Sequence, residues 1–119
     1  MAQPFVHLEL NTPDLNKAKD FYGKLFGWTF NDFPMAHGVY SLFKPDSGPG
    51  GGMMSMKEAP TAWLAYVGVD DIRAATDKAK SLGATIIRDS IPVPDEGIFS
   101  IVTDPTGAMI ALWQQTRKS

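Results

Sequence analysis

The stretch HLELNTPDLNKAKDFYGKLFG, residues 7–27, recurs in altered form as LAYVGVDDIRAATDKAKSLG, residues 64–83, at an offset of 57 residues. Both segments carry apolar residues at the spacing i, i+3, i+7, i+10, which is typical of the buried stripe of an amphipathic helix. These residues are Leu15, Ala18, Tyr22 and Leu25 in the first segment, and Ile72, Ala75, Ala79 and Leu82 in the second. The repeat predicts two copies of one structural unit.

The ends of both helices carry the expected signals. Gly27 and Gly83 follow the apolar stripes, where a glycine commonly closes a helix. For the first helix, Thr12 is a candidate N-cap with Pro13 at the first helical position. We therefore expect each helix to begin shortly after an extended segment and to stop at a glycine.

Extended segments flank both helices. In FVHLEL, residues 5–10, Val6, Leu8 and Leu10 point to one side while His7 and Glu9 point to the other. Strand-like pieces after the helices are VYSLF (39–43), GGMMSM (51–56), ATIIRD (84–89), IFSIVTD (98–104) and AMIALWQ (108–114). Each half therefore reads as strand–helix–strand–strand–strand, and GPGGG (48–52) as a flexible connection.

We predict an α+β fold in a single domain, residues 1–119, built from two tandem βαβββ modules at 4–56 and 61–116. The joint KEAPT, residues 57–61, is too short to be a flexible linker. One helix cannot cover both faces of its sheet, so we expect two modules to pair into a cupped mixed sheet. Pairing within one chain and pairing between two chains both stay open.

The composition is that of a folded protein and excludes several function classes. The 119 residues are 44% hydrophobic and 20% charged, with a net charge of −2, so no basic surface for nucleic acid or anionic membrane is expected. There is no cysteine, which excludes disulfides and thiolate chemistry. We see neither a signal peptide nor an apolar run of about 20 residues, and expect a cytoplasmic protein.

The three segments HLELNTPDLNKAKDFYGKLFGW (7–28), VGVDDIRAATDKAKSLGA (67–84) and DPTGAMIALWQ (104–114) resemble the vicinal oxygen chelate superfamily, which includes glyoxalase I, bleomycin-resistance proteins and extradiol dioxygenases. The resemblance implies paired βαβββ modules. It also implies a divalent metal held by four side chains, from the first and last strands of each module. A homodimer is the assembly that the resemblance suggests.

Carried over residue by residue, the metal positions are His7 and Leu64 on the first strands, Ala111 on the last strand of the second module, and Met54 or Ser55 on that of the first. Only His7 is a competent ligand for a hard or borderline metal ion, and a Lewis-acid site needs about three protein ligands. We expect no cofactor; His7 is the one weak metal candidate.

Glu9 shares a strand face with His7, so the two could form a hydrogen-bonded acid–base pair. The alternative interpretation makes His7 a satisfied pocket histidine and Glu9 a polar residue at the sheet mouth. An apolar cavity wall would come from both modules. The expected ligand-binding residues are Phe43, Met54, Leu64, Tyr66, Met109, Ala111 and Trp113.

Three hypotheses for the function follow. The first, which we favour, is a bleomycin-resistance-like protein that binds a small apolar or aromatic molecule without a catalytic metal. The second is a lyase or isomerase of the glyoxalase type that uses a metal or His7 as a general base. The third is a structural or partner-binding module with a filled interior.

Overall fold

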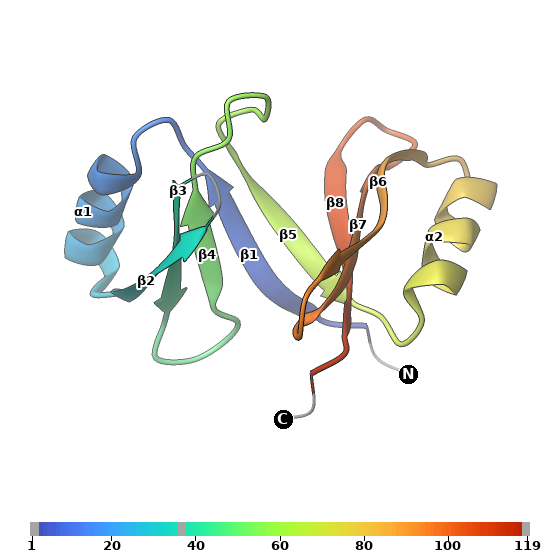
Figure 1. Cartoon of the computed structure of the whole chain (residues 1–119). Coiled ribbons are helices and arrows are strands. Elements are labelled where there is room, and N and C mark those ends of the chain that lie inside the picture. The colour runs from blue at the N-terminus through green and yellow to red at the C-terminus, as the bar shows by residue number, and fades with distance from the viewer. Residues whose placement is uncertain (1–2, 36–37, 118–119) are drawn as a thin grey trace. The chain divides into compact units, whose positions relative to one another are not determined.

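The computed structural model describes residues 3–35 and 38–117, and within them the βαβββ order occurs twice (Figure 1). The chain divides into two compact units. One is Val6–Leu64; the other comprises the described parts of Ala65–Ser119 and Met1–Phe5. His37, which the sequence places in a turn, lies outside the described residues.

The first module consists of β1 (Phe5–Asn11), α1 (Leu15–Phe26), β2 (Thr29–Met35), β3 (Gly38–Lys44) and β4 (Gly51–Met54). Its strands follow the order β2-β3-β4-β1, in which β1 and β4 are parallel and the other neighbours antiparallel. The sequence did not identify β2, which is held in place by its pairing with β3 from Thr29 to Met35.

The second module repeats this plan with β5 (Ala62–Gly68), α2 (Ile72–Ser81), β6 (Thr85–Val93), β7 (Gly97–Thr103) and β8 (Met109–Gln115). Its strand order is β5-β8-β7-β6, and the first and last strands are again parallel neighbours. The predicted α+β class and the βαβββ repeat are therefore confirmed.

Both helices are capped by equivalent aspartates rather than by Thr12. The Asp14 carboxylate accepts from the backbone N–H of Lys17 at 3.0 Å, and that of Asp71 accepts from Ala74 at 3.1 Å. The Thr12 hydroxyl instead accepts from the N–H of Asp14, too early in the chain to cap the helix. Gly27 ends α1 in the left-handed conformation, φ 75°, as its position predicts.

The core of the first module lies between its sheet and α1. Leu10, Phe43 and Met53 are its buried members, and the helix contributes Ala18 and Tyr22 against them. Phe43 stacks on Trp28 with ring centroids 4.4 Å apart. The sequence placed Phe43 in the ligand cavity; this is wrong, because its side chain belongs to the helix-side core of the module.

The core of the second module forms between α2 and its own sheet. Ile72 and Val102 are buried there, and a polar contact lies among them: the hydroxyls of Thr76 and Ser100 are 2.8 Å apart. Thr76 also donates to the carbonyl of Ile72, so neither hydroxyl is left unsatisfied. The face of this sheet that α2 covers is therefore the one with Ser100 and Val102.

The segment after β4 is bound to the first module by one side chain, that of the buried Asn11. Its amide nitrogen donates to the carbonyls of Met56, Ala59 and Pro60 at 2.9–3.1 Å, and its oxygen accepts from the N–H of Met56 at 2.7 Å. Four hydrogen bonds to one side chain fix the path of the joint.

Neither helix is long and apolar enough, over the residues described, to cross a membrane.

Candidate functional site

The face of the first sheet opposite α1 carries the two polar residues that the sequence singled out. In β1, Leu8 and Leu10 point toward the helix, so His7 and Glu9 point away from it. Across the strands, Glu9 is paired with Gly52, and Gly52 with Leu42. Side chains of this row therefore lie on the face opposite α1.

Tyr40 joins His7 and Glu9 into one hydrogen-bonded array. Its hydroxyl lies 2.8 Å from Nε2 of His7 and donates to Oε2 of Glu9 at 2.9 Å. The His7 and Tyr40 rings lie nearly parallel, at an interplanar angle of 10°. The sequence predicted His7 and Glu9 on one face, but not the tyrosine that connects them, because the register of β3 is not readable from alternation alone.

Gly52 makes room for Tyr40. A Cβ added at Gly52 would overlap the Cζ, Oη and Cε2 atoms of the tyrosine, so the phenol lies directly across the glycine backbone. Gly51 is equally constrained on the other face, by the carbonyl of Leu8 and the ring of Phe43. The segment GPGGG was expected to be a flexible connection, but its last two glycines belong to β4. Without side chains, they allow close packing on both faces of that strand.

Burial and hydrogen bonding together indicate the protonation of His7. Burial lowers the pKa of His7 from its ordinary value, so the imidazole is neutral at pH 7. Because the Tyr40 hydroxyl gives its proton to Glu9, the neutral imidazole must donate from Nε2 to the tyrosine oxygen. The assignment makes Nδ1 the acceptor nitrogen of His7.

The strand register identifies the residue of the first module that corresponds to Ala111. Ala111 is paired with Tyr66, which stands 57 residues after Glu9, and Glu9 is paired with Gly52. The counterpart of Ala111 is therefore Gly52, and the expectation of Met54 or Ser55 at this position is wrong. Met54 lies two residues further along β4, on the same face as Gly52.

The residues at these positions do not fit a catalytic metal. Leu64, Ala111 and Gly52 have no side-chain donor atom, and Nε2 of His7 is bonded to Tyr40. Across residues 3–35 and 38–117, no group of three or more His, Cys, Asp or Glu side chains is placed to hold a metal ion.

In the second module, the predicted ligand residues share the face opposite α2. Tyr66 is paired with Ala111, and Trp113 and Met109 are the same-face neighbours of Ala111 along β8. Leu64 precedes Tyr66 by two residues on β5 and takes the same face. Tyr66 and Ala111 are buried, and the ring of Tyr66 meets that of Phe99 edge-on.

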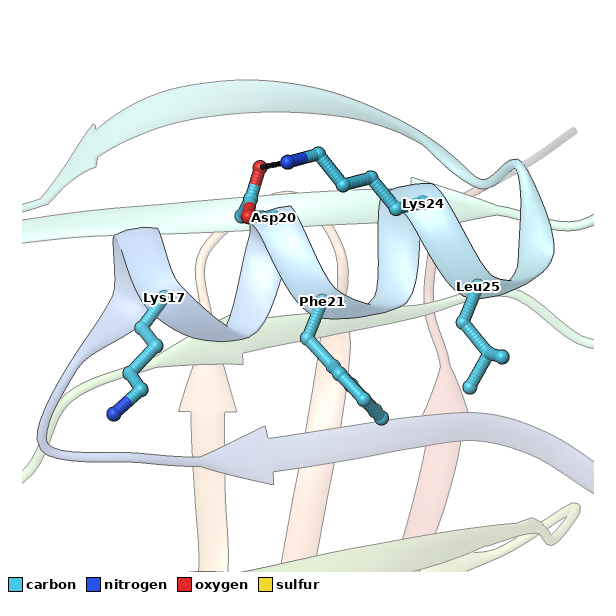
Figure 2. A pocket seen from close by; sticks show the side chains of 5 residues that line it. All are labelled: Lys17, Asp20, Phe21, Lys24 and Leu25. Atoms are coloured by element: carbon cyan, nitrogen blue, oxygen red, sulfur yellow. Dashed lines mark ion pairs between the residues drawn. The ribbon is translucent and has the colours of Figure 1, made fainter.

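A shallow surface hollow lies elsewhere, along α1. Figure 2 shows Lys17, Phe21 and Leu25 extending from one side of the helix, with the Asp20–Lys24 ion pair on another. Phe21 and Leu25 are each 56% exposed. The hollow holds neither a histidine nor an acid–base array, so the face with Tyr40 is the better candidate for a functional site.

Comparison with known proteins agrees with the fold. The model of the Glyoxalase/Bleomycin resistance protein/Dioxygenase superfamily matches residues 5–112. The putative glyoxylase CFP32 of Mycobacterium tuberculosis is 35% identical over 117 residues, covering 92% of this chain and 45% of the relative. The anthracycline biosynthesis protein DnrV of Streptomyces peucetius is 30% identical over 128 residues, covering 90% of this chain and 45% of the relative.

Solved structures share the architecture at low identity. A hypothetical protein, BH1468 from Bacillus halodurans, matches with a TM-score of 0.80 at 10% identity, over 100% of this chain and 99% of its own. Methylmalonyl-CoA epimerase from Mycobacterium tuberculosis matches with a TM-score of 0.71 at 16% identity, over 94% of this chain and 87% of its own. These likenesses show the fold alone, and the chain spans less than half the length of the curated relatives. By the family match, which covers most of its length, the chain belongs to the Glyoxalase/Bleomycin resistance protein/Dioxygenase superfamily.

Proposed function

We propose that this protein binds a small apolar or aromatic molecule without a catalytic metal, and that the face opposite α1 contributes the polar end of the site. The observation that carries the proposal is the His7–Tyr40–Glu9 array, which shares its face of the sheet with the apolar side chains of Phe33, Leu42 and Met54. Small-molecule sites combine apolar walls with a few polar groups that orient the ligand.

The apolar part of this surface is partly exposed. Phe33 is paired with Tyr40 and is 50% exposed, and Leu42, next to Gly52, is 37% exposed. Met54 completes the row and can adapt to the shape of a ligand. On the second module, the face opposite α2 is considered by itself, and there we propose Leu64, Tyr66, Met109, Ala111 and Trp113 as ligand-binding residues.

The absence of a catalytic metal is part of the proposal. It is supported by the chemistry of the side chains: among the four positions His7, Gly52, Leu64 and Ala111, only His7 has a side-chain donor atom. The name of DnrV places that relative in anthracycline biosynthesis. Anthracyclines are flat polycyclic aromatic compounds, a ligand class that would suit this surface.

A second candidate is metal-free proton transfer in a lyase or isomerase reaction. It is favoured by the neutral His7, whose lowered pKa leaves the imidazole able to accept a proton at pH 7. In this case His7 would be the base, and Tyr40 and Glu9 would orient it. Loss of turnover in His7→Gln together with unchanged ligand affinity would select this candidate over simple binding.

Thermal-shift screening of protein dialysed against a chelator tests the first candidate, since a ligand that binds the folded state raises its melting temperature. The chain offers a matched pair of variants in two similarly exposed phenylalanines, Phe33 at 50% and Phe21 at 56%. Phe33→Ala should weaken the affinity for a hit, and Phe21→Ala, on α1, should not. If a broad set of aromatic compounds gives no hit, the filled-interior module is the better description.

The homodimer that the family resemblance implies remains a prediction. Light scattering on the eluting peak of a sizing column should give twice the mass of the 13.0 kDa chain. A monomer at micromolar concentration would contradict it.

A further inference from the structure

We infer that the register of β2 is set from the helix side of the sheet, by a contact that joins α1, β2 and β3. The contact consists of Lys19, Asp32 and the buried Ser41. It holds Phe33, the residue next to Asp32, beside Tyr40 on the opposite face. Lys19 is then a positioning residue for the candidate site. What the inference says about a ligand rests on the function proposed above; what it says about the register does not.

The residue pattern of β2 defines its register only weakly. Asn31, Asp32 and Pro34 are poor strand formers, and polar side chains lie on both faces of the strand. β2 is also an edge strand, with β3 as its one neighbour in the sheet. A strand that is polar on both faces is prone to slip unless a specific contact fixes it.

Asp32 makes such a contact on the face toward α1. Lys19 donates to both carboxylate oxygens, at 2.9 and 2.8 Å, from a side chain that is only 22% exposed. Ser41, directly opposite Asp32 in the register and fully buried, donates its hydroxyl proton to Oδ1 at 2.5 Å. The hydrogen bond from Lys19, followed by that from Ser41, holds the pKa of Asp32 below its ordinary value, so the carboxylate is ionised at pH 7.

A displaced register would break this contact. A shift by one residue would place Asn31 or Phe33 opposite Ser41 and turn the carboxylate away from the helix. A shift by two residues would place Phe30 or Pro34 opposite Ser41, and neither side chain can accept its proton. In every case the ammonium group of α1 would lose its charged partner, so the observed register is the one that the contact stabilises.

Lys19 meets β2 at two residues of the same strand face. Besides its bonds to Asp32, its ammonium nitrogen lies 5.9 Å from the centroid of the Phe30 ring, which is a cation–π contact. Phe30 itself packs against the core of the module. One side chain of the helix therefore joins α1 to the edge strand.

The consequence for the candidate site comes through Phe33. It follows Asp32 in the chain and so takes the opposite face of β2, where it is paired with Tyr40 and is 50% exposed. The place of this ring thus depends on a contact on the other side of the sheet. Loss of the contact should weaken the binding of an aromatic ligand although no residue on the ligand face has changed.

Amide hydrogen exchange measured by NMR tests the register. Lys19→Met keeps a long unbranched side chain over Phe30 but removes the charge, and in this variant the β2 amides bonded to β3 should exchange about threefold or more faster. The β1 amides should not change, and the cross-strand NOE contacts between Phe33 and Tyr40 should weaken. Lys19→Arg, which keeps the charge, and Lys17→Met, at an exposed lysine of α1, should both resemble wild type.

The same variants test the consequence for binding. The probe is 2-naphthol, a neutral aromatic compound, titrated by calorimetry at pH 7. Its affinity should fall about threefold or more in Lys19→Met and stay within about twofold of wild type in Lys19→Arg and Lys17→Met. Rescue by arginine separates the role of the charge from that of packing.

The outcomes separate this inference from the function on which its last step rests. Unchanged exchange of the β2 amides in Lys19→Met, or an equal increase in β1, would overturn the inference whatever the probe does. Faster exchange in β2 with unchanged affinity for 2-naphthol would overturn the positioning role. If 2-naphthol does not bind wild type, the proposed binding function is contradicted for this ligand class, and the exchange rates still decide the register.

Ser41→Ala provides a second route to the exchange measurement if Lys19→Met fails to fold. It removes the hydroxyl that donates to Asp32 from the β3 side of the contact. The β2 amides should again exchange about threefold or more faster, with β1 unchanged. Equal exchange rates in this variant and wild type would contradict the role given to the contact.

Discussion

Tyr40 lies across the backbone of Gly52, so closely that a Cβ at position 52 would overlap the phenol. Position 52 is the counterpart of Ala111, one of the places where metal-binding members of the family are expected to carry a ligand. A side chain at position 52 and Tyr40 in its present place therefore exclude each other. In this chain the tyrosine occupies the space that such a ligand would need, and its hydroxyl also engages His7.

This exclusion predicts a specific coupling between two substitutions. Gly52→Ala should lower the free energy of unfolding by about 1–3 kcal/mol, because the added methyl group displaces a packed ring. In a Tyr40→Ala background the same change should cost much less. Urea unfolding of the two single variants and the double variant measures the coupling. Strictly additive effects would show that Tyr40 does not lie over Gly52.

His7 predicts a pH dependence of stability. Its pKa is lower in the folded than in the unfolded protein, where it is about 6.5. Below that value the unfolded state binds more protons, so the free energy of unfolding falls as the pH drops through 6.5 toward the folded pKa. Above about pH 7.5 the imidazole of His7 is neutral in both states, so it no longer makes the free energy of unfolding depend on pH.

Comparing wild type with His7→Gln isolates the contribution of His7, because the glutamine amide can still donate to Tyr40. Both proteins keep His37, so the effect of that histidine cancels. Wild type should lose more stability than the variant between pH 7.5 and 5.5 in urea unfolding. An NMR titration should place the His7 transition below 6.5. A transition above 6.5, or an equal loss in the two proteins, would be inconsistent with burial of the neutral imidazole.

Asn11 predicts that the joint between the modules depends on one side chain. Asn11→Ala removes the hydrogen bonds of this buried side chain to residues 56–60 and leaves their backbone groups without these partners. We expect a loss of about 2–4 kcal/mol and faster hydrogen exchange at the N–H of Met56. Asn16→Ala, on the exposed side of α1, is the matched control and should change neither quantity appreciably. Similar results for both variants would refute the role given to Asn11.

The sequence predicted the fold well because its repeat is carried by strong periodic signals. The stripes from Leu15 and from Ile72 gave both helices, and the offset of 57 residues is reproduced by β1 and β5. Strand alternation placed His7 and Glu9 on the face opposite the helix. It did not give β2, because Asn31, Asp32 and Pro34 are poor strand formers, and tertiary contacts with β3 and α1 hold them in a strand.

The site was less predictable, because faces depend on register. Phe43 and Tyr40 both lie on β3, and because they are three residues apart they take opposite faces of the sheet. Which face each one takes follows from the pairing of β3 with β4, where Phe43 lies opposite Gly51 and Leu42 opposite Gly52. The equivalence of Gly52 and Ala111 likewise needs two parallel strand pairs. A possible signal was the glycine run itself: consecutive glycines inside a strand indicate close approach on both faces.

The central claim, small-molecule binding without a catalytic metal, is tested most directly by one titration. An aromatic ligand found by screening is titrated into protein stripped by chelator, and again after addition of zinc, nickel or manganese ions. We predict the same affinity with and without metal, and a weaker affinity in Phe33→Ala. Binding that disappears on stripping and returns with one of these ions would contradict the claim.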